Sequence, residues 1–308
     1  MPPIVEAVPN VSEGRRGELI SSIAEAFGST PGVILLDVSS DATHNRSVLT
    51  AIGEPSALEE ASLRLFQSAI DKIDLGMHRG AHPRIGAVDV LPFVPVEGVT
   101  MKDCVELARR VGEKVAERFR LPIFLYEEAA VRRDRSDLAA IRKGQFEGLA
   151  EKMKAPFWKP DFGPAAPHPT AGAAAVGARI PLIAYNVILG TDRIEVAQAI
   201  AKRVRHSGGG LPYVKALGIG LEESGRVQVS MNLTDYRRTP LHLAFEAVRV
   251  EAERRGVPVL SSEIVGLAPM DALLSACGYF LKLDACNRDV VLEEKIRQAL
   301  AKKKLAGG

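Results

Sequence analysis

Residues 214–233 read VKALGIGLEESGRVQVSMNL, and this pattern of two apolar segments around Ser224 and Gly225 predicts a β-hairpin. Apolar spacing and turn residues predict elements on both sides of the hairpin: a strand over 179–189, a helix over 192–204, a helix from Thr239 and Pro240 onward, and a strand over 256–265. The second half of the chain therefore follows the order strand–helix–hairpin–helix–strand, which is the split βαβ arrangement.

The first half of the chain shows a related order. The predicted elements are a strand over 5–8, a helix capped by Ser12 and running through Phe27, strands over 33–38 and 47–52, a helix from Pro55, a strand over 88–96, a helix over 101–119 and a strand over 123–126. We therefore expect an α/β (α+β) fold of two similar subdomains, 1–178 and 179–308. Each should contain a mainly antiparallel sheet with helices packed on it, in a ferredoxin-like split βαβ topology.

The segment between the two halves, 154–179, is rich in proline, glycine and alanine and has little helical or strand pattern. A linker is the simplest interpretation. However, the segment also holds Phe157, Trp158 and Phe162, and a flexible linker rarely carries three aromatic residues. We expect it to pack along the seam between the subdomains, where ligand sites often lie.

Composition excludes several classes of protein. The 308 residues carry a formal charge of only +2, which gives no sign of a nucleic-acid partner. Three scattered cysteines, Cys104, Cys277 and Cys286, are too few for a disulfide framework or a zinc site. No signal peptide and no apolar run of membrane-spanning length is evident, so we expect a cytoplasmic protein without a membrane segment.

The loop GMHRGAHPRIGAVDV, residues 76–90, gathers unusual polar chemistry between apolar segments. The imidazole of His82 can take up and return a proton near neutral pH, and Pro83 stiffens the chain beside it. We expect Asp89 to accept a hydrogen bond from an imidazole and Arg84 to hold a carboxylate bidentately. The loop is therefore a candidate site for proton transfer on an anionic substrate.

Other interpretations of this loop remain open. A His-Pro pair in a loop is often structural. His78 and His82 have the i, i+4 spacing of two metal ligands, but that spacing brings ligands together only on a continuous helix, and Gly80 and Pro83 argue against one. No third ligand is evident nearby.

Two further polar segments, 8–15 (VPNVSEGR) and 39–48 (SSDATHNRSV), each follow a predicted strand. In a sheet domain these segments and the His82 loop can share one end, so their side chains can converge. The simpler interpretations are a helix cap at Ser12 for the first segment and an ordinary hairpin loop for the second.

Taken together, VPNVSEG (8–14), THNRS (43–47), HRGAHPRIGAVDV (78–90), PDFGP (160–164) and GAR (177–179) resemble glutamate formimidoyltransferases, the formiminotransferase family of histidine degradation. VSMNLTDY (229–236) and IVGLAP (264–269) resemble the family's second subdomain. The resemblance implies transfer of a formimino group from N-formimino-L-glutamate to N5 of tetrahydrofolate. It also implies a folate groove enclosed by two subdomains.

The resemblance also implies site residues. The family's catalytic histidine corresponds to His82, here a general acid and base. Arg46 and Arg84 are candidates for the substrate carboxylates, because a planar guanidinium suits them. Asp37 or Asp41 could face the pterin or orient a histidine. The second-rank candidates for hydrogen bonding are Asn10, Ser12, Glu13 and Asn45. The family's folate-binding stretch corresponds to Gly163, Pro164, Ala165, Ala166, Pro167, His168, Pro169, Thr170, Ala171 and Gly172.

Tetrahydrofolate is the implied co-substrate, and no metal is required. The resemblance further implies a homodimer and a separate cyclodeaminase that acts on the product. Two alternatives stay open at this point. One is a metal-dependent hydrolase of a formimino or formyl amino acid that uses His78, His82 and Asp89 as ligands, and the other is a folate-binding module without catalytic activity.

Overall fold

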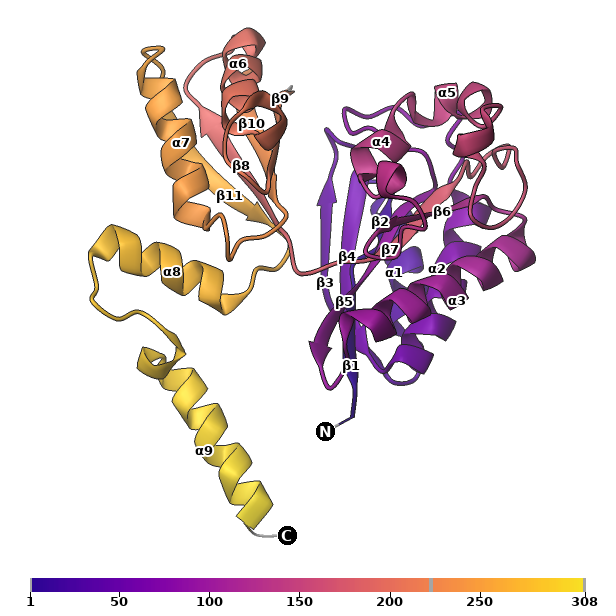
Figure 1. Cartoon of the computed structure of the whole chain (residues 1–308), viewed down its shortest axis with the longest axis horizontal. Coiled ribbons are helices and arrows are strands. Elements are labelled where there is room, and N and C mark those ends of the chain that lie inside the picture. The colour runs from indigo at the N-terminus through magenta and orange to yellow at the C-terminus, as the bar shows by residue number, and fades with distance from the viewer. Residues whose placement is uncertain (1, 222–223, 307–308) are drawn as a thin grey trace. The chain divides into compact units, whose positions relative to one another are not determined.

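The computed structural model describes residues 2–221 and 224–306, so two residues of the predicted hairpin, Glu222 and Glu223, lie outside the described residues. The chain divides into two compact units, Met1–Ile180 and Pro181–Gly308 (Figure 1). No helix of the described ranges has the length and apolar character needed to cross a membrane.

The first unit contains one seven-stranded sheet, in which β1 and β2 together lie between β4 and β5. The remaining strands give the order β3-β4-β1/β2-β5-β7-β6, with antiparallel pairing up to β5 and parallel pairing of β7 with both β5 and β6. The elements are β1 (Ile4–Ala7), β2 (Asn10–Val11), α1 (Gly17–Gly28), β3 (Val33–Asp41), β4 (Arg46–Gly53), α2 (Pro55–Lys72), β5 (Val88–Glu97), α3 (Met101–Phe119), β6 (Ile123–Glu127), α4 (Leu138–Arg142), α5 (Gln145–Lys152) and β7 (Ala174–Ala178).

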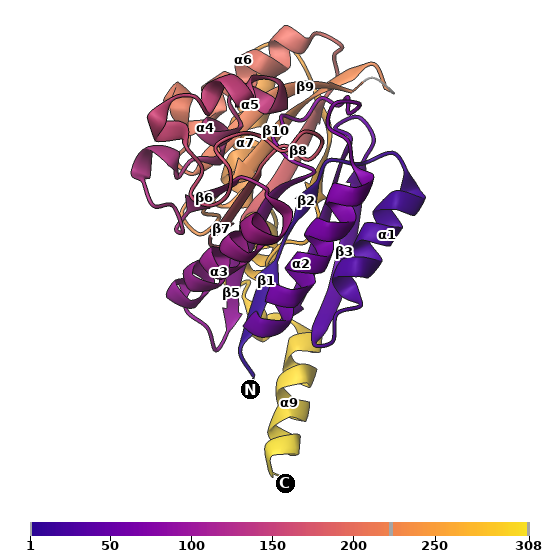
Figure 2. The same ribbon diagram turned by 90° about the vertical axis from the view of Figure 1, so that its right-hand side faces the viewer.

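Helices α1, α2 and α3 lie side by side on one face of this sheet (Figure 2). Their apolar residues recur at helical spacing, and Phe27, Phe66 and Leu107 are fully buried against the sheet. Local signals fix two of the starts: a proline opens α2, and Thr100 and Asp103 form a capping box at α3. This layer supplies the main core of the unit.

The opposite face of the sheet is covered only in part. Helices α4 and α5 pack over β5, β6 and β7, where Ile141 and Leu149 join Val90 and Phe124 in a second apolar cluster. The connector also contributes, because Trp158 packs on this cluster and the Lys152 ammonium lies 3.7 Å from its ring centroid. Over β2, β3 and β4 the same face carries polar side chains, and these form part of the site described below.

The connector corrects one expectation. Residues 174–178 (AAVGA), predicted to lack strand structure, form β7, and the strand predicted over 179–189 begins only at Ile183. Small residues have weak strand propensity, but here they are fully buried between two strands and beneath α3, where little room exists for larger side chains. The placement of the connector along a seam between subdomains stays a prediction.

The second unit is a four-stranded antiparallel sheet of order β11-β8-β10-β9, and α6 and α7 pack on one of its faces. The corresponding strands of the first unit follow the same order, β5-β1-β4-β3. The ferredoxin-like split βαβ prediction is therefore confirmed for both halves. The elements are β8 (Ile183–Leu189), α6 (Ile194–Val204), β9 (Val214–Leu221), β10 (Arg226–Leu233), α7 (Leu241–Glu253), β11 (Val259–Val265), α8 (Met270–Leu281) and α9 (Leu292–Ala306).

The predicted cap of α1 is wrong. The helix begins at Gly17, and the hydroxyl of Ser12 instead donates a 2.7 Å hydrogen bond to the carbonyl of Gly86. The carboxylate of Glu13 accepts the backbone N–H groups of Arg15 and Arg16 just before the helix. Ser12 therefore joins two loops, and the carboxylate of Glu13 satisfies two N–H groups of the segment that precedes the helix, which has no side-chain cap.

Candidate active site

Three loops of the first unit meet around Asn45, as the sequence suggested. Its side chain accepts the N–H of Gly14 (2.9 Å) and donates to the carbonyl of Arg79 (2.9 Å), while its own carbonyl contacts Nε2 of His78 at 2.8 Å. Gly80 is required here, since a Cβ on it would lie 2.3 Å from the carbonyl oxygen of His44. The loops before α1, between β3 and β4, and after α2 therefore form one body.

His82 lies at the edge of this body and contacts Arg46. Its Nε2 is 2.7 Å from Nη1 of Arg46. Because a guanidinium only donates, Nε2 accepts and the ring proton of neutral His82 is on Nδ1. Burial, and then the charges of Arg46 and Arg142, hold the pKa of His82 well below its usual value. His82 is therefore a neutral imidazole at physiological pH.

Arg46 has a buried donor without a partner among the described residues. Burial, and then the charge of Arg142, lower the pKa of Arg46 to about 10, so it remains a cation at neutral pH. Its Nε is buried and has no hydrogen-bond partner in the part of the chain that the structure describes. A buried, cationic donor without an acceptor is what a carboxylate ligand would satisfy.

Arg142 was not predicted from the sequence. Its guanidinium bonds the carboxylate of Asp89 at 2.9 Å and 2.5 Å, and Asp89 also accepts the N–H of Ile85 at 2.7 Å. The expectation that Asp89 would bond an imidazole is wrong, because Arg142 and the Ile85 N–H take up its carboxylate. Asp89 therefore holds the end of the His82 loop. It also holds the guanidinium of Arg142, whose charge lowers the pKa of His82.

Arg84 is bound by side chains of the first unit. Nearly buried, it binds both carboxylate oxygens of Glu147 (2.9 Å and 2.8 Å) and donates to Nδ1 of His78 at 3.0 Å. Hydrogen bonding to Arg84 lowers the pKa of Glu147 to about 2, so the pair is ionised. Both Nη atoms of Arg84 are bonded to the protein's own carboxylate, and the substrate contact expected for Arg84 stays a prediction.

The predicted residues on the β-strands share one face of the sheet. Asn10 lies opposite Val48, Asp37 opposite Thr50 and Asp41 opposite Arg46, and the three partners alternate along β4. Leu49 and Ala51, the residues on either side of Thr50, point into the helical core. Asn10, Asp37, Asp41 and Arg46 therefore lie on the face opposite α1 and α2.

His44 lies in the polar segment 39–48 but was not predicted to be a site residue. Nδ1 of this buried side chain lies 2.5 Å from Asp41, which also accepts the backbone N–H of His44 at 2.8 Å. Burial raises the pKa of Asp41, but its hydrogen bonds with His44 outweigh burial and lower it. The ring packs edge to face with His82 at a centroid distance of 6.3 Å.

The predicted folate stretch lies against the His82 loop. Ala87 donates to the carbonyl of Ala171, Leu75 donates to that of Thr170, and Gly86 pairs with Gly172. Nδ1 of His168 accepts the N–H of Ala171 (3.1 Å), which closes a turn within the stretch, and burial lowers the pKa of His168. Residues 163–170 stay at least partly exposed, so this turn presents its surface beside the loop.

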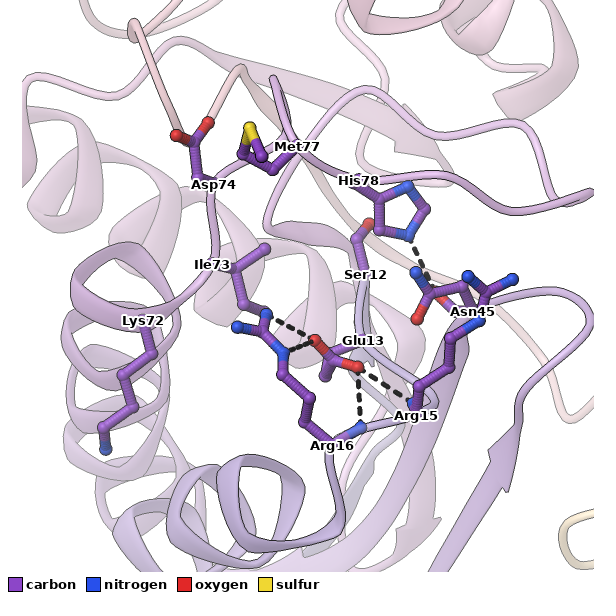
Figure 3. A pocket seen from close by; sticks show the side chains of 10 residues that line it. All are labelled: Ser12, Glu13, Arg15, Arg16, Asn45, Lys72, Ile73, Asp74, Met77 and His78. Carbon is purple, nitrogen blue, oxygen red and sulfur yellow. Dashed lines mark hydrogen bonds and ion pairs between the residues drawn. The ribbon is translucent and has the colours of Figure 1, made fainter.

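A cavity of about 330 Å³ adjoins the three loops (Figure 3). Figure 3 shows the carboxylate of Glu13 held by Arg15 and Arg16 on its wall. Burial raises the pKa of Glu13, but these N–H groups and the guanidinium of Arg16 outweigh burial and lower it. The lining residues are Ser12, Glu13, Arg15, Arg16, Asn45, Lys72, Ile73, Asp74, Met77 and His78.

Among the described residues, no group of three or more His, Cys, Asp or Glu side chains has an arrangement that could hold a metal ion. His78 is engaged with Arg84 and Asn45, and Asp89 with Arg142. His78, His82 and Asp89, the ligands expected for a metal-dependent hydrolase, therefore do not form a metal site among the described residues.

Comparisons with known proteins cover nearly the whole chain. The family model described as the formiminotransferase domain, N-terminal subdomain, matches residues 4–179, and the model described as the formiminotransferase domain matches 184–306. A glutamate formimidoyltransferase of Streptococcus pyogenes serotype M1 is 48% identical over 92% of this chain and 95% of its own length. One of Thermoplasma acidophilum is 47% identical over 96% and 98%.

A formimidoyltransferase-cyclodeaminase of Mus musculus is 42% identical over 99% of this chain but only 57% of its own length. Among solved structures, a microcompartment protein of Desulfitobacterium hafniense DCB aligns over 88% of this chain and 97% of its own, with 12% identity and a TM-score of 0.23. A score that low carries no argument about fold or function.

Proposed function

This chain belongs to the formiminotransferase family, and from that premise we propose that it transfers the formimino group of N-formimino-L-glutamate to N5 of tetrahydrofolate, with His82 as the group that moves the proton. The products are 5-formiminotetrahydrofolate and glutamate. The comparisons do not favour the metal-dependent hydrolase or the non-catalytic folate module.

One observation supports the role of His82 most directly: a neutral imidazole whose Nε2 contacts a cation with an unsatisfied donor. A base must be neutral to accept a proton, and the arginine beside it can bind a substrate carboxylate. We assign Arg46 to a carboxylate of formiminoglutamate. That carboxylate would then accept a hydrogen bond from the buried Nε and draw the guanidinium away from Nε2 of His82.

The chemistry follows from these positions. As the bond between N5 and the formimino carbon forms, His82 Nε2 accepts the proton that N5 loses. As the bond between that carbon and the glutamate nitrogen breaks, the nitrogen keeps the electron pair and receives a proton. Holding both reactants in one site contributes as much as the proton transfer, because it replaces a bimolecular encounter with an oriented one.

We place tetrahydrofolate, the co-substrate, along the stretch Gly163–Gly172 and on the polar face that carries Asn10, Asp37 and Asp41. The exposed turn at 163–170 and the hydrogen bond that Ala171, just after it, accepts from Ala87 of the His82 loop support this placement. Asn45 is assigned to holding the loops rather than to direct contact, since both ends of its amide are already bonded. Arg84 is assigned to orienting His78.

The wider setting is also proposed. We infer two formiminotransferase subdomains over 1–178 and 179–308, a cytoplasmic location, a role in histidine degradation, and a separate cyclodeaminase acting on the product. No step of the mechanism requires a metal. A homodimer is supported by α8, which leaves Tyr279, Phe280 and Leu281 about half exposed or more.

The test mixes the protein with formiminoglutamate and tetrahydrofolate and follows 5-formiminotetrahydrofolate by absorbance. We expect turnover by the wild type and by His206→Asn, a control at an exposed histidine of the second unit, and a loss of most activity in His82→Ala and His82→Asn. Tetrahydrofolate should raise the melting temperature of all four proteins, because binding to the native state alone stabilises it. Full turnover by folded His82→Ala would overturn the assignment of His82.

A further inference from the structure

The site contains a second imidazole that the mechanism above does not use. His44 comes from the turn between β3 and β4, and its ring meets the edge of His82. Asp41 holds it at two points, through the backbone N–H and through Nδ1. Both bonds fix the ring, and the bond to a carboxylate places the Nδ1 proton, so Nε2 is the atom left for chemistry.

The Nε2 atom of His44 forms no hydrogen bond within the described ranges, and it is not one of the fully buried atoms that lack a partner, so solvent or a ligand can reach it. An imidazole that only joins loops can bond through both nitrogens. His78 shows that pattern in the same site, with Arg84 on Nδ1 and Asn45 on Nε2.

The two imidazoles have neighbours of opposite charge. His82 lies beside Arg46 and under the influence of Arg142, so its environment disfavours a proton on the ring. Nδ1 of His44 instead contacts the carboxylate of Asp41. Pairs of titratable groups in such contrasting environments commonly divide the roles of base and acid.

Building on the proposed transferase function, we propose that His44, oriented by Asp41, is the general acid that protonates the departing glutamate nitrogen while His82 serves as the base. As the carbon–nitrogen bond breaks, its electron pair stays on the glutamate nitrogen, and that nitrogen takes the proton from His44 Nε2. His82 keeps the proton removed from N5. Exchange with solvent then returns His82 to the neutral form and His44 to the protonated form.

The test uses His44→Ala and His44→Gln in the full chain, with His206→Ala as the matched control. A general acid contributes about 10²–10⁴-fold, so kcat should fall by at least about 100-fold while KM for both substrates changes little. Added imidazole should restore the activity of His44→Ala in proportion to its concentration, and it should leave His206→Ala unchanged. Asp41→Asn should lower kcat in the same direction, since it loosens the ring.

Three results would overturn the proposal. The first is a kcat of both His44 variants within about threefold of wild type. The second is a loss of activity that imidazole does not restore although His44→Ala melts like the wild type and keeps its tetrahydrofolate-induced shift. The third applies if His44→Ala does not fold. In that case a wild-type kcat of His44→Gln, which replaces the ring with a group that cannot transfer a proton, overturns the proposal. An inactive wild type would instead contradict the transferase function itself.

Discussion

Replacing Asp89 by alanine should destabilise the first unit by about 3–5 kcal/mol, because it leaves a nearly buried arginine charge without its partner. Asp89 is 1% exposed and the side chain of Arg142 is 14% exposed, so water cannot replace the lost carboxylate. The N–H of Ile85 also loses its acceptor, which contributes about 1–3 kcal/mol of that cost. With a urea m value of about 3 kcal/mol/M, the unfolding midpoint should fall by about 1–2 M.

Trp158 makes the measurement specific, because it is the only tryptophan of the chain and packs within the first unit. Its fluorescence in urea reports the unfolding of that unit alone. The double variant Asp89→Leu with Arg142→Met removes both charges and should recover most of the loss, apart from the part due to the N–H of Ile85. A loss below about 1 kcal/mol in Asp89→Ala, or no recovery in the double variant, would refute the reasoning.

Four further predictions address the site and its surroundings. Arg46→Gln removes a charge that lowers the pKa of His82, so the acid limb of the plot of kcat/KM against pH should move to higher pH. An acid limb that does not move would contradict the contact between Arg46 and His82. The folded-state pKa of His82 lies below 6.5, so the unfolded chain binds a proton at this histidine first as the pH falls. The contribution of His82 to stability is therefore complete above about pH 6.5 and is lost below it. Between about pH 6.5 and 5, the urea midpoint of His82→Asn should decrease less than that of the wild type. Gly86→Ala should prevent folding, since a Cβ there lies 1.9 Å from the carbonyl oxygen of Ala173, whereas Gly17→Ala, with nothing within 4 Å, should leave circular dichroism unchanged. Burial raises the pKa of Cys104 to about 11, so a thiol reagent should modify exposed Cys277 in the native protein and reach Cys104 only after denaturation; rapid labelling of Cys104 would argue against its burial.

The sequence predicted those elements whose pattern is local. Apolar spacing placed the helix 101–119 with its observed bounds, and the hairpins with their flanking helices gave the topology of both halves. It did not predict β7, because five small residues carry no strand periodicity and become a strand only when two partners enclose them. It misplaced the helix cap at Ser12, because a serine before a helix cannot be distinguished by type from one that bonds a distant loop.

In the candidate site too, local patterns were predicted from the sequence and contacts between distant residues were not. Side-chain chemistry in loops pointed to His82 and Arg46, and the structure brings these two together. Arg142 could not be found, because its partner Asp89 is distant in the sequence and only folding makes the pair. His44 did leave a signal, an aspartate three residues before a histidine in a turn, but a tight turn of polar residues is common enough that the pattern alone selects nothing.

The position of β7 has a consequence for biosynthesis. Among the described strands, β6 pairs only with β7, and β7 also joins β5, so the last strand of the unit to be translated fills the gap between two earlier ones. A nascent chain released from the ribosome before Ala178 would expose the edges of both waiting strands. A fragment for separate expression of this unit must therefore include residues 174–178, and one that stops sooner should accumulate in inclusion bodies.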